Sequence, residues 1–100
     1  MNRKASFVRR SRATKIVATL GPGTSSPEQI RALFEAGVDV FRLNFSHGTQ
    51  QDHGTRLEIL RALEHETGRP ICAMADLQGP KLRVGRFASG SIQLSPGMKF

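Results

Sequence analysis

Three short apolar segments, separated by two segments of helical pattern, constrain the fold of this chain most. Residues 14–20 and 38–45 are rich in β-branched and apolar side chains, and residues 71–75 form a continuous apolar run. Such runs are typical of strands that a parallel sheet buries on both faces. Parallel strands need a long crossover, usually a helix. The order strand, helix, strand, helix, strand therefore predicts right-handed βαβ units and an α/β fold with a parallel sheet.

Capping residues and leucine spacing delimit the two intervening helices. Ser25 or Ser26 can cap the first helix, and Pro27 suits its first turn. Gly37 ends this helix where a left-handed residue is favoured. The second helix is predicted over residues 52–66, where leucines recur at helical spacing: Leu57, Leu60 and Leu63.

The pattern changes after Pro80. Turn signals at residues 89–91 and 95–97 flank alternating apolar and polar side chains, and no helical pattern returns. We therefore expect an antiparallel β module that begins after the third strand and is cut off at residue 100. The expected organisation is a basic arm over residues 1–13, an α/β part over residues 14–80, and the start of a second, β-rich domain over residues 81–100.

The formal charge of +7 in 100 residues is concentrated at the N-terminus. Six basic residues precede the first acidic one, Glu28, and the rest of the chain is nearly neutral. With one aromatic residue in the arm, we expect a solvated tail and no nucleic-acid partner. No run approaches the roughly 18 apolar residues of a membrane span, so we expect a cytoplasmic protein with no membrane partner. The single cysteine, Cys72, lies in an apolar segment and is expected to be buried.

Polar side chains interrupt the second predicted strand at residues 42–48. With a period of two, Arg42, Asn44 and Ser46 share one face, and apolar side chains occupy the other. A guanidinium suits an anionic oxygen, and amide and hydroxyl oxygens suit a nucleotide or a hard cation. This face of the strand indicates phosphate chemistry.

Asp76 follows the third predicted strand, at the end where parallel α/β proteins carry their ligands. If the second and third strands are neighbours, Asn44, Ser46 and Asp76 converge as oxygen donors for a hard cation. Arg42 lies deeper on the same face. The alternative for Arg42 is an internal salt bridge to Asp76 or another carboxylate.

Other candidate residues carry weaker signals. His47 can donate to a phosphate or be an ordinary loop residue, and His53 and His65 are expected to be solvated helix residues without zinc spacing. Lys81 and Arg83 can reach a phosphate or simply face solvent. The turn at residues 21–23 lacks the features of a P-loop and of a dinucleotide fold.

The three strand motifs resemble those of the pyruvate kinase family. The motifs are residues 14–22, residues 42–48, and the segment from Asp76 through Pro80 to Arg83, in the family's order and spacing. The resemblance implies the start of a (β/α)8 barrel, with a β-rich lid domain inserted after the third strand. It also implies phosphoryl transfer from phosphoenolpyruvate to ADP, giving pyruvate and ATP with Mg²⁺, in a cytoplasmic homotetramer.

The same resemblance implies roles for individual residues. Arg42 would contact the substrate and the phosphoryl group. The nucleotide site would be lined by Asn44, Phe45, Ser46, His47 and Arg83. A potassium ion would be held by Asn44, Ser46, Asp76 and the backbone carbonyl of Leu77. No catalytic residue, and none of the Mg²⁺ ligands or the catalytic lysine, is expected within these 100 residues.

Lys81 departs from the commoner family pattern, which has a glutamate at this position. A lysine beside a potassium site is tolerated poorly unless its ammonium replaces the ion. We therefore expect a potassium-independent variant with Lys81 as an internal cation.

A barrel of this type needs about 250 residues, so the 100 residues alone are expected to be inactive. Two alternatives remain open: a nucleotide- or phosphate-binding module without catalysis, and an interaction protein that uses its basic arm.

Overall fold

A computed structural model describes residues 10–99 of the chain. It contains three parallel strands, β1 (Val17–Leu20), β2 (Val40–Asn44) and β3 (Cys72–Asp76), with two intervening helices, α1 (Pro27–Ala36) and α2 (Gln50–Thr67). A short 3₁₀ helix, η1 (Pro22–Thr24), follows β1. The predicted βαβαβ order is confirmed.

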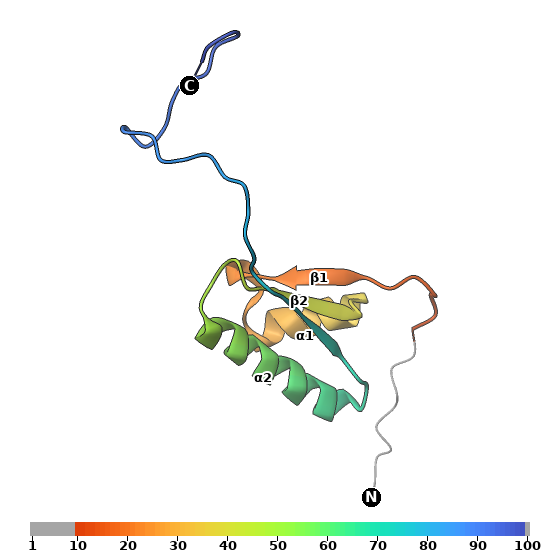
Figure 1. Cartoon of the computed structure of the whole chain (residues 1–100). Coiled ribbons are helices and arrows are strands. Elements are labelled where there is room, and N and C mark those ends of the chain that lie inside the picture. The colour runs from red at the N-terminus through yellow and green to blue at the C-terminus, as the bar shows by residue number, and fades with distance from the viewer. Residues whose placement is uncertain (1–9, 100) are drawn as a thin grey trace, which may run out of the picture.

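The sheet has the order β1-β2-β3, and both helices lie on the same side of it (Figure 1). In register, Thr19 lies opposite Arg42, which lies opposite Met74, and Asn44 lies opposite Asp76. All three strands therefore end at one edge, where the loops that enter the helices also begin. This is the edge at which parallel α/β proteins bind their ligands.

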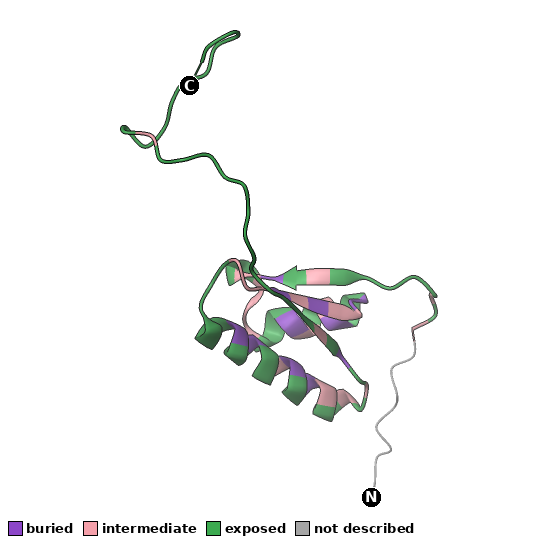
Figure 2. Ribbon diagram, viewed as in Figure 1, coloured by how far each residue is buried: buried purple, intermediate pink, exposed green. Residues whose placement is uncertain are grey.

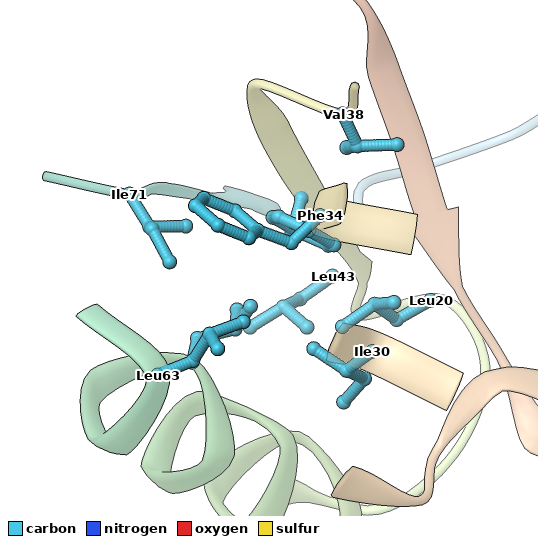
Figure 3. Close-up of a cluster of buried hydrophobic side chains, with 9 residues drawn as sticks. Leu20, Ile30, Phe34, Val38, Leu43, Leu63 and Ile71 are labelled. Atoms are coloured by element: carbon cyan, nitrogen blue, oxygen red, sulfur yellow. The ribbon is translucent and has the colours of Figure 1, made fainter. Parts of the chain in front are cut away.

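The core lies between the sheet and the two helices (Figure 3). Its buried side chains come from β1, β2, both α-helices and the segments before β2 and β3: Leu20, Ile30, Phe34, Val38, Phe41, Leu43, Leu60, Leu63 and Ile71. Phe41 and Leu43 alternate with the half-buried Val40, Arg42 and Asn44 along β2. The period-two pattern predicted for this strand is confirmed.

The opposite face of the sheet is uncovered in this chain (Figure 2). Val17, Cys72 and Met74 lie on it and are exposed. The prediction that Cys72 is buried is wrong, because β3 carries a helix on one face only. Parallel sheets are normally covered on both faces, so exposed apolar residues on parallel strands are unusual. This face therefore resembles one that is buried in a larger α/β structure.

Capping boxes fix the starts of both helices. Ser26 Oγ accepts from the Gln29 N–H at 3.2 Å, and Thr49 Oγ1 accepts from the Asp52 N–H at 3.1 Å. α2 therefore begins two residues before the predicted start. Gly68 ends α2 in the left-handed region, with φ of 68°, where glycine is favoured.

The described part of the basic arm is anchored to the sheet. The side chain of Asp39, just before β2, is only 7% exposed; it accepts from Arg12 at 2.9 Å and Arg69 at 3.1 Å, and it lies 3.6 Å from Arg10. Arg10 also donates to the Val38 carbonyl at 3.2 Å, near the end of α1. The interpretation of the arm as a solvated tail is wrong for Arg10 and Arg12, and residues 1–9 lie outside the described residues.

Residues 77–99 run away from the sheet without a strand (Figure 1). Two turns occur at the predicted turn signals, with Gly90 N–H bonded to the Phe87 carbonyl and Met98 N–H bonded to the Ser95 carbonyl. The expected antiparallel module is therefore not formed in the described segment. None of the helices within residues 10–99 is long and apolar enough to cross a membrane.

Candidate functional site

Arg42 and Asp76 meet on the open face of the sheet. Arg42 Nε donates to Asp76 Oδ2 at 2.9 Å, and Nη2 donates to the same oxygen. Nη1 donates to Thr19 Oγ1 at 3.1 Å. The internal salt bridge left open for Arg42 is thus present. A guanidinium has five N–H donors, so Arg42 still has N–H groups without a partner among residues 10–99.

The segment after β2 folds into a tight polar turn. Asn44 Oδ1 accepts from the Ser46 N–H at 3.1 Å, and the Asn44 carbonyl accepts from the His47 N–H at 3.2 Å. The Phe45 N–H donates to the Asp76 carbonyl at 3.0 Å. These bonds hold the carboxyl ends of β2 and β3 together and fix the turn with Ser46 and His47 at the ligand-binding edge.

A pocket of about 370 Å³ opens at the ends of β1 and β2. The turn after β1 contributes Gly21 and Pro22, and the turn after β2 contributes Asn44, His47 and Gly48. The start of α2 closes it with Asp52, His53 and Arg56. Of these three parts, the sequence predicted the turn after β2 as a binding site. It did not predict a role for the turn after β1 or for the start of α2.

His53 is buried, so its prediction as a solvated residue is wrong. It is 3% exposed, stacks on Phe45 with ring centroids 4.5 Å apart, and its Nε2 lies 2.7 Å from the His47 carbonyl. The sequence does contain a signal for this burial. His53 and Arg56 are spaced from Leu60 and Leu63 by three or four residues, so all four side chains lie on one face of the helix. His65, by contrast, is exposed as predicted.

Asp52 carries a negative charge at the same helix start. The Thr49 backbone N–H, bonded to Asp52 Oδ2 at 2.9 Å, lowers the pKa of this carboxyl, and the Thr49 side chain and the charge of Arg56 lower it further. Asp52 therefore remains ionised beside the pocket at neutral pH.

The predicted cation donors are only partly brought together. Asn44 and Asp76 are register partners, and Ser46 follows two residues after Asn44. The Asp76 carboxylate, however, already neutralises Arg42. Among residues 10–99, no three His, Cys, Asp or Glu side chains gather in a way that could hold a metal ion.

The remaining predicted site residues lie apart from the pocket. Leu77, Lys81 and Arg83 are exposed and belong to the segment that runs away from the sheet. The Phe45 ring is stacked on His53, so Phe45 can offer a ligand its backbone more readily than its ring.

The three parallel strands with their two crossover helices define an α/β protein, and the arrangement is consistent with part of a barrel. The barrel-domain model of pyruvate kinase matches residues 11–100. The chain belongs to the pyruvate kinase family.

Individual relatives agree with this assignment. A pyruvate kinase of Agrobacterium vitis is 53% identical over 91 residues, which are 91% of this chain and 19% of that protein. Pyruvate kinases of Methylorubrum extorquens and Mycobacterium tuberculosis are 50% and 52% identical over 93% and 87% of this chain, and over 20% and 18% of their own lengths. The chain thus spans about a fifth of the length of the curated relatives it matches.

Proposed function

We propose that this chain is the N-terminal part of the barrel of a pyruvate kinase that transfers a phosphoryl group from phosphoenolpyruvate to ADP, giving pyruvate and ATP in glycolysis. The observation that carries the proposal is the polar edge formed by Arg42, Asn44 and the turn after β2, in a chain about half identical to named pyruvate kinases. The relatives' greater length supports a catalytic unit that includes residues beyond these 100.

Arg42 is proposed to bind the phosphoryl group. Its Nε and Nη2 are occupied by Asp76, and Nη1 by Thr19, which fixes the plane of the guanidinium. The unpartnered N–H groups are then held ready for an anionic oxygen, at little further cost in side-chain entropy. The side chain is 29% exposed, so a ligand on the open face can reach it.

The nucleotide is proposed to occupy the pocket at the ends of β1 and β2. Asn44 and His47 line this pocket, and Phe45 and Ser46 lie between them in the same turn, where their backbone and the Ser46 hydroxyl are proposed to contact the nucleotide. Arg83 would join them when the segment after β3 folds over this edge as the start of the lid domain. That movement is a proposal, because residues 77–99 lie away from the pocket.

The monovalent cation is proposed to be weakly bound or replaced. Asn44, Ser46, Asp76 and the Leu77 carbonyl offer oxygen donors, but the one full negative charge among them is paired with Arg42. A site with less negative charge holds a cation less tightly. Lys81 would supply the cation in its place, which makes the enzyme potassium-independent.

The rest of the machinery is proposed to lie elsewhere in the complete gene product. A bound Mg²⁺ would neutralise charge on the transferred phosphoryl group, and the described residues offer no cluster of three ligands for it. A cytoplasmic homotetramer is proposed as the working form. The alternative function, nucleotide binding without catalysis, is favoured by the pocket alone and predicts ADP binding without pyruvate formation.

The test is to incubate the complete gene product that contains these residues with phosphoenolpyruvate, ADP and Mg²⁺, and to follow the phosphorus by ³¹P NMR. We expect the phosphoenolpyruvate signal to be replaced by that of the γ-phosphate of ATP, with one pyruvate formed for each ATP. Binding of ADP without loss of the phosphoenolpyruvate signal would support the module without catalysis instead.

A further inference from the structure

A continuous line of hydrogen bonds joins the two turns that frame the pocket. His53 Nε2 lies 2.7 Å from the His47 carbonyl, and Arg56 Nη1 lies 3.3 Å from His53 Nδ1. Arg56 Nε donates to Ser25 Oγ at 2.9 Å, and Ser25 donates to the Gly21 carbonyl at 2.6 Å. We call His53, Arg56 and Ser25 the His53 relay.

The chemistry of the partners settles the protonation of the relay. A carbonyl oxygen only accepts, so His53 Nε2 carries the hydrogen and donates it to the His47 carbonyl. A guanidinium only donates, so His53 Nδ1 is bare and accepts from Arg56. These two bonds hold the His53 ring in one hydrogen-bonding arrangement, and the hydroxyl of Ser25 is oriented by accepting from Arg56 and donating to Gly21.

Burial makes these bonds expensive to lose. His53 is 3% exposed and Arg56 is 7% exposed. If His53 cannot donate, the His47 carbonyl loses its partner beneath the pocket, and a buried acceptor without a hydrogen bond is unfavourable. The turn also passes beside the imidazole, since a Cβ at Gly48 would be in ordinary van der Waals contact with His53 Nε2, at 3.4 Å.

We infer that His53 is a positioning residue for the nucleotide: through its relay it fixes the turns at Gly21 and His47 at the separation that the nucleotide pocket requires. The inference rests on the proposed function for the identity of the ligand. His53 does not face Arg42, which lies on the opposite side of β2, so its effect is confined to the nucleotide and spares phosphoenolpyruvate.

Two substitutions separate positioning from packing. The amide nitrogen of His53→Gln can reach the His47 carbonyl as Nε2 does, whereas His53→Asn is too short and retains only an acceptor for Arg56. His65→Asn is the matched control, because His65 lies on the same helix and is exposed. Ser25→Ala breaks the relay at its other end, far from the imidazole, and Ser91→Ala is its exposed control.

The experiment measures the ADP dissociation constant by isothermal titration and the KM of both substrates, using the complete gene product. We expect His53→Asn to weaken ADP binding by about tenfold, the effect of one buried hydrogen bond lost with its acceptor left unpaired. His53→Gln should stay within about threefold of the unmodified protein, and the KM for phosphoenolpyruvate should not change. Ser25→Ala should weaken ADP binding in the same direction.

Three results would overturn the inference: unchanged ADP binding in His53→Asn, equal losses in His53→Asn and His53→Gln, or an equal rise in both KM values. If His53→Asn does not fold, Ser25→Ala decides, and unchanged ADP binding in that variant refutes the relay. If the unmodified protein binds ADP but forms no pyruvate, the proposed function is wrong. The relay is then still tested by the ADP dissociation constants of the variants.

Discussion

Arg42 and Asp76 are joined across neighbouring strands, with the guanidinium Nε 2.9 Å from the carboxylate Oδ2. Asp76 lies at the end of β3 on the face that Arg42 shares, two residues beyond Met74, the register partner of Arg42. The carboxylate thus aims the guanidinium at the edge where the strands end. The pairing orients Arg42, the residue proposed to bind the phosphoryl group. It also neutralises the one carboxylate of the proposed cation site.

Asp76→Asn should therefore impair the binding of phosphoenolpyruvate. The amide cannot accept from Arg42 as a carboxylate does, so the guanidinium loses its fixed orientation, and we expect the KM for phosphoenolpyruvate to rise by about tenfold. Glu66→Gln is the matched control, because it breaks the exposed Arg31–Glu66 pair between α1 and α2. Steady-state kinetics of the complete gene product measure the effect, and an unchanged KM in Asp76→Asn would refute the orienting role.

Lys81→Glu should create a requirement for potassium. The unmodified protein is expected to work equally well in sodium and potassium salts, because the Lys81 ammonium is proposed to take the place of the ion. When the segment after β3 folds over the strand ends as proposed, a glutamate at residue 81 adds negative charge beside the oxygen donors and restores the need for a cation.

The measurement is turnover at constant ionic strength with K⁺ exchanged for Na⁺, and Lys99→Glu is the control for charge alone. A many-fold activation of the unmodified enzyme by K⁺ would show that the proposed replacement is incorrect.

Asp39→Asn should destabilise the fold. The buried carboxylate accepts from Arg12, Arg69 and the Ile16 N–H, and its neutralisation leaves clustered guanidinium groups without a counter-charge. Breaking a buried ion pair from one side suggests a loss of about 3 kcal/mol in the free energy of unfolding. Urea denaturation of the complete gene product measures it, with the exposed Glu35→Gln as control. A loss as small as that of the control would show that the cluster contributes little.

The same carboxylate predicts a pH dependence. The Ile16 backbone N–H, followed by the Arg12 guanidinium, lowers the pKa of Asp39 in the folded state. Because the folded pKa lies below the unfolded value of about 3.9, the stabilisation is complete above that value and is lost as the pH falls through the folded pKa. The stability difference between the unmodified protein and Asp39→Asn should be constant near neutral pH and shrink below about pH 4. A difference that persists undiminished at pH 2 would contradict this origin.

The spacing of apolar residues and the capping residues were enough to predict the order of the elements and which face of β2 carries Arg42. Phe41 and Leu43 point to the core and Arg42 to the open face because a strand alternates, whatever its neighbours are. The ends were less predictable. Residues 14–16 were predicted to be strand, but Ile16 instead bonds to the Asp39 carboxylate, a contact that requires the tertiary fold.

The site was harder to predict than the fold, because its polar residues look like surface residues in a linear pattern. His53 and Arg56 lie on the same helix face as Leu60 and Leu63, yet His53 is predicted from its polarity to face solvent. Only the turns that pass over them supply the carbonyl and hydroxyl partners that allow their burial. The sequence left the pairing of Arg42 with Asp76 open as an alternative to ligand binding, and the register of β2 and β3, which puts both side chains on the open face, allows it to form.

Phosphoryl transfer by Arg42 variants of the complete gene product tests the account most directly. Arg42→Lys keeps the charge but loses the planar fork, and Arg42→Gln loses both, so we expect kcat/KM for phosphoenolpyruvate to fall by about 10²-fold or more, with Arg42→Gln the more impaired. Arg31→Lys, on the exposed face of α1, should leave turnover unchanged. Pyruvate formation at the unmodified rate in both Arg42 variants would contradict the proposal that the transferred phosphoryl group is bound on this face of the sheet.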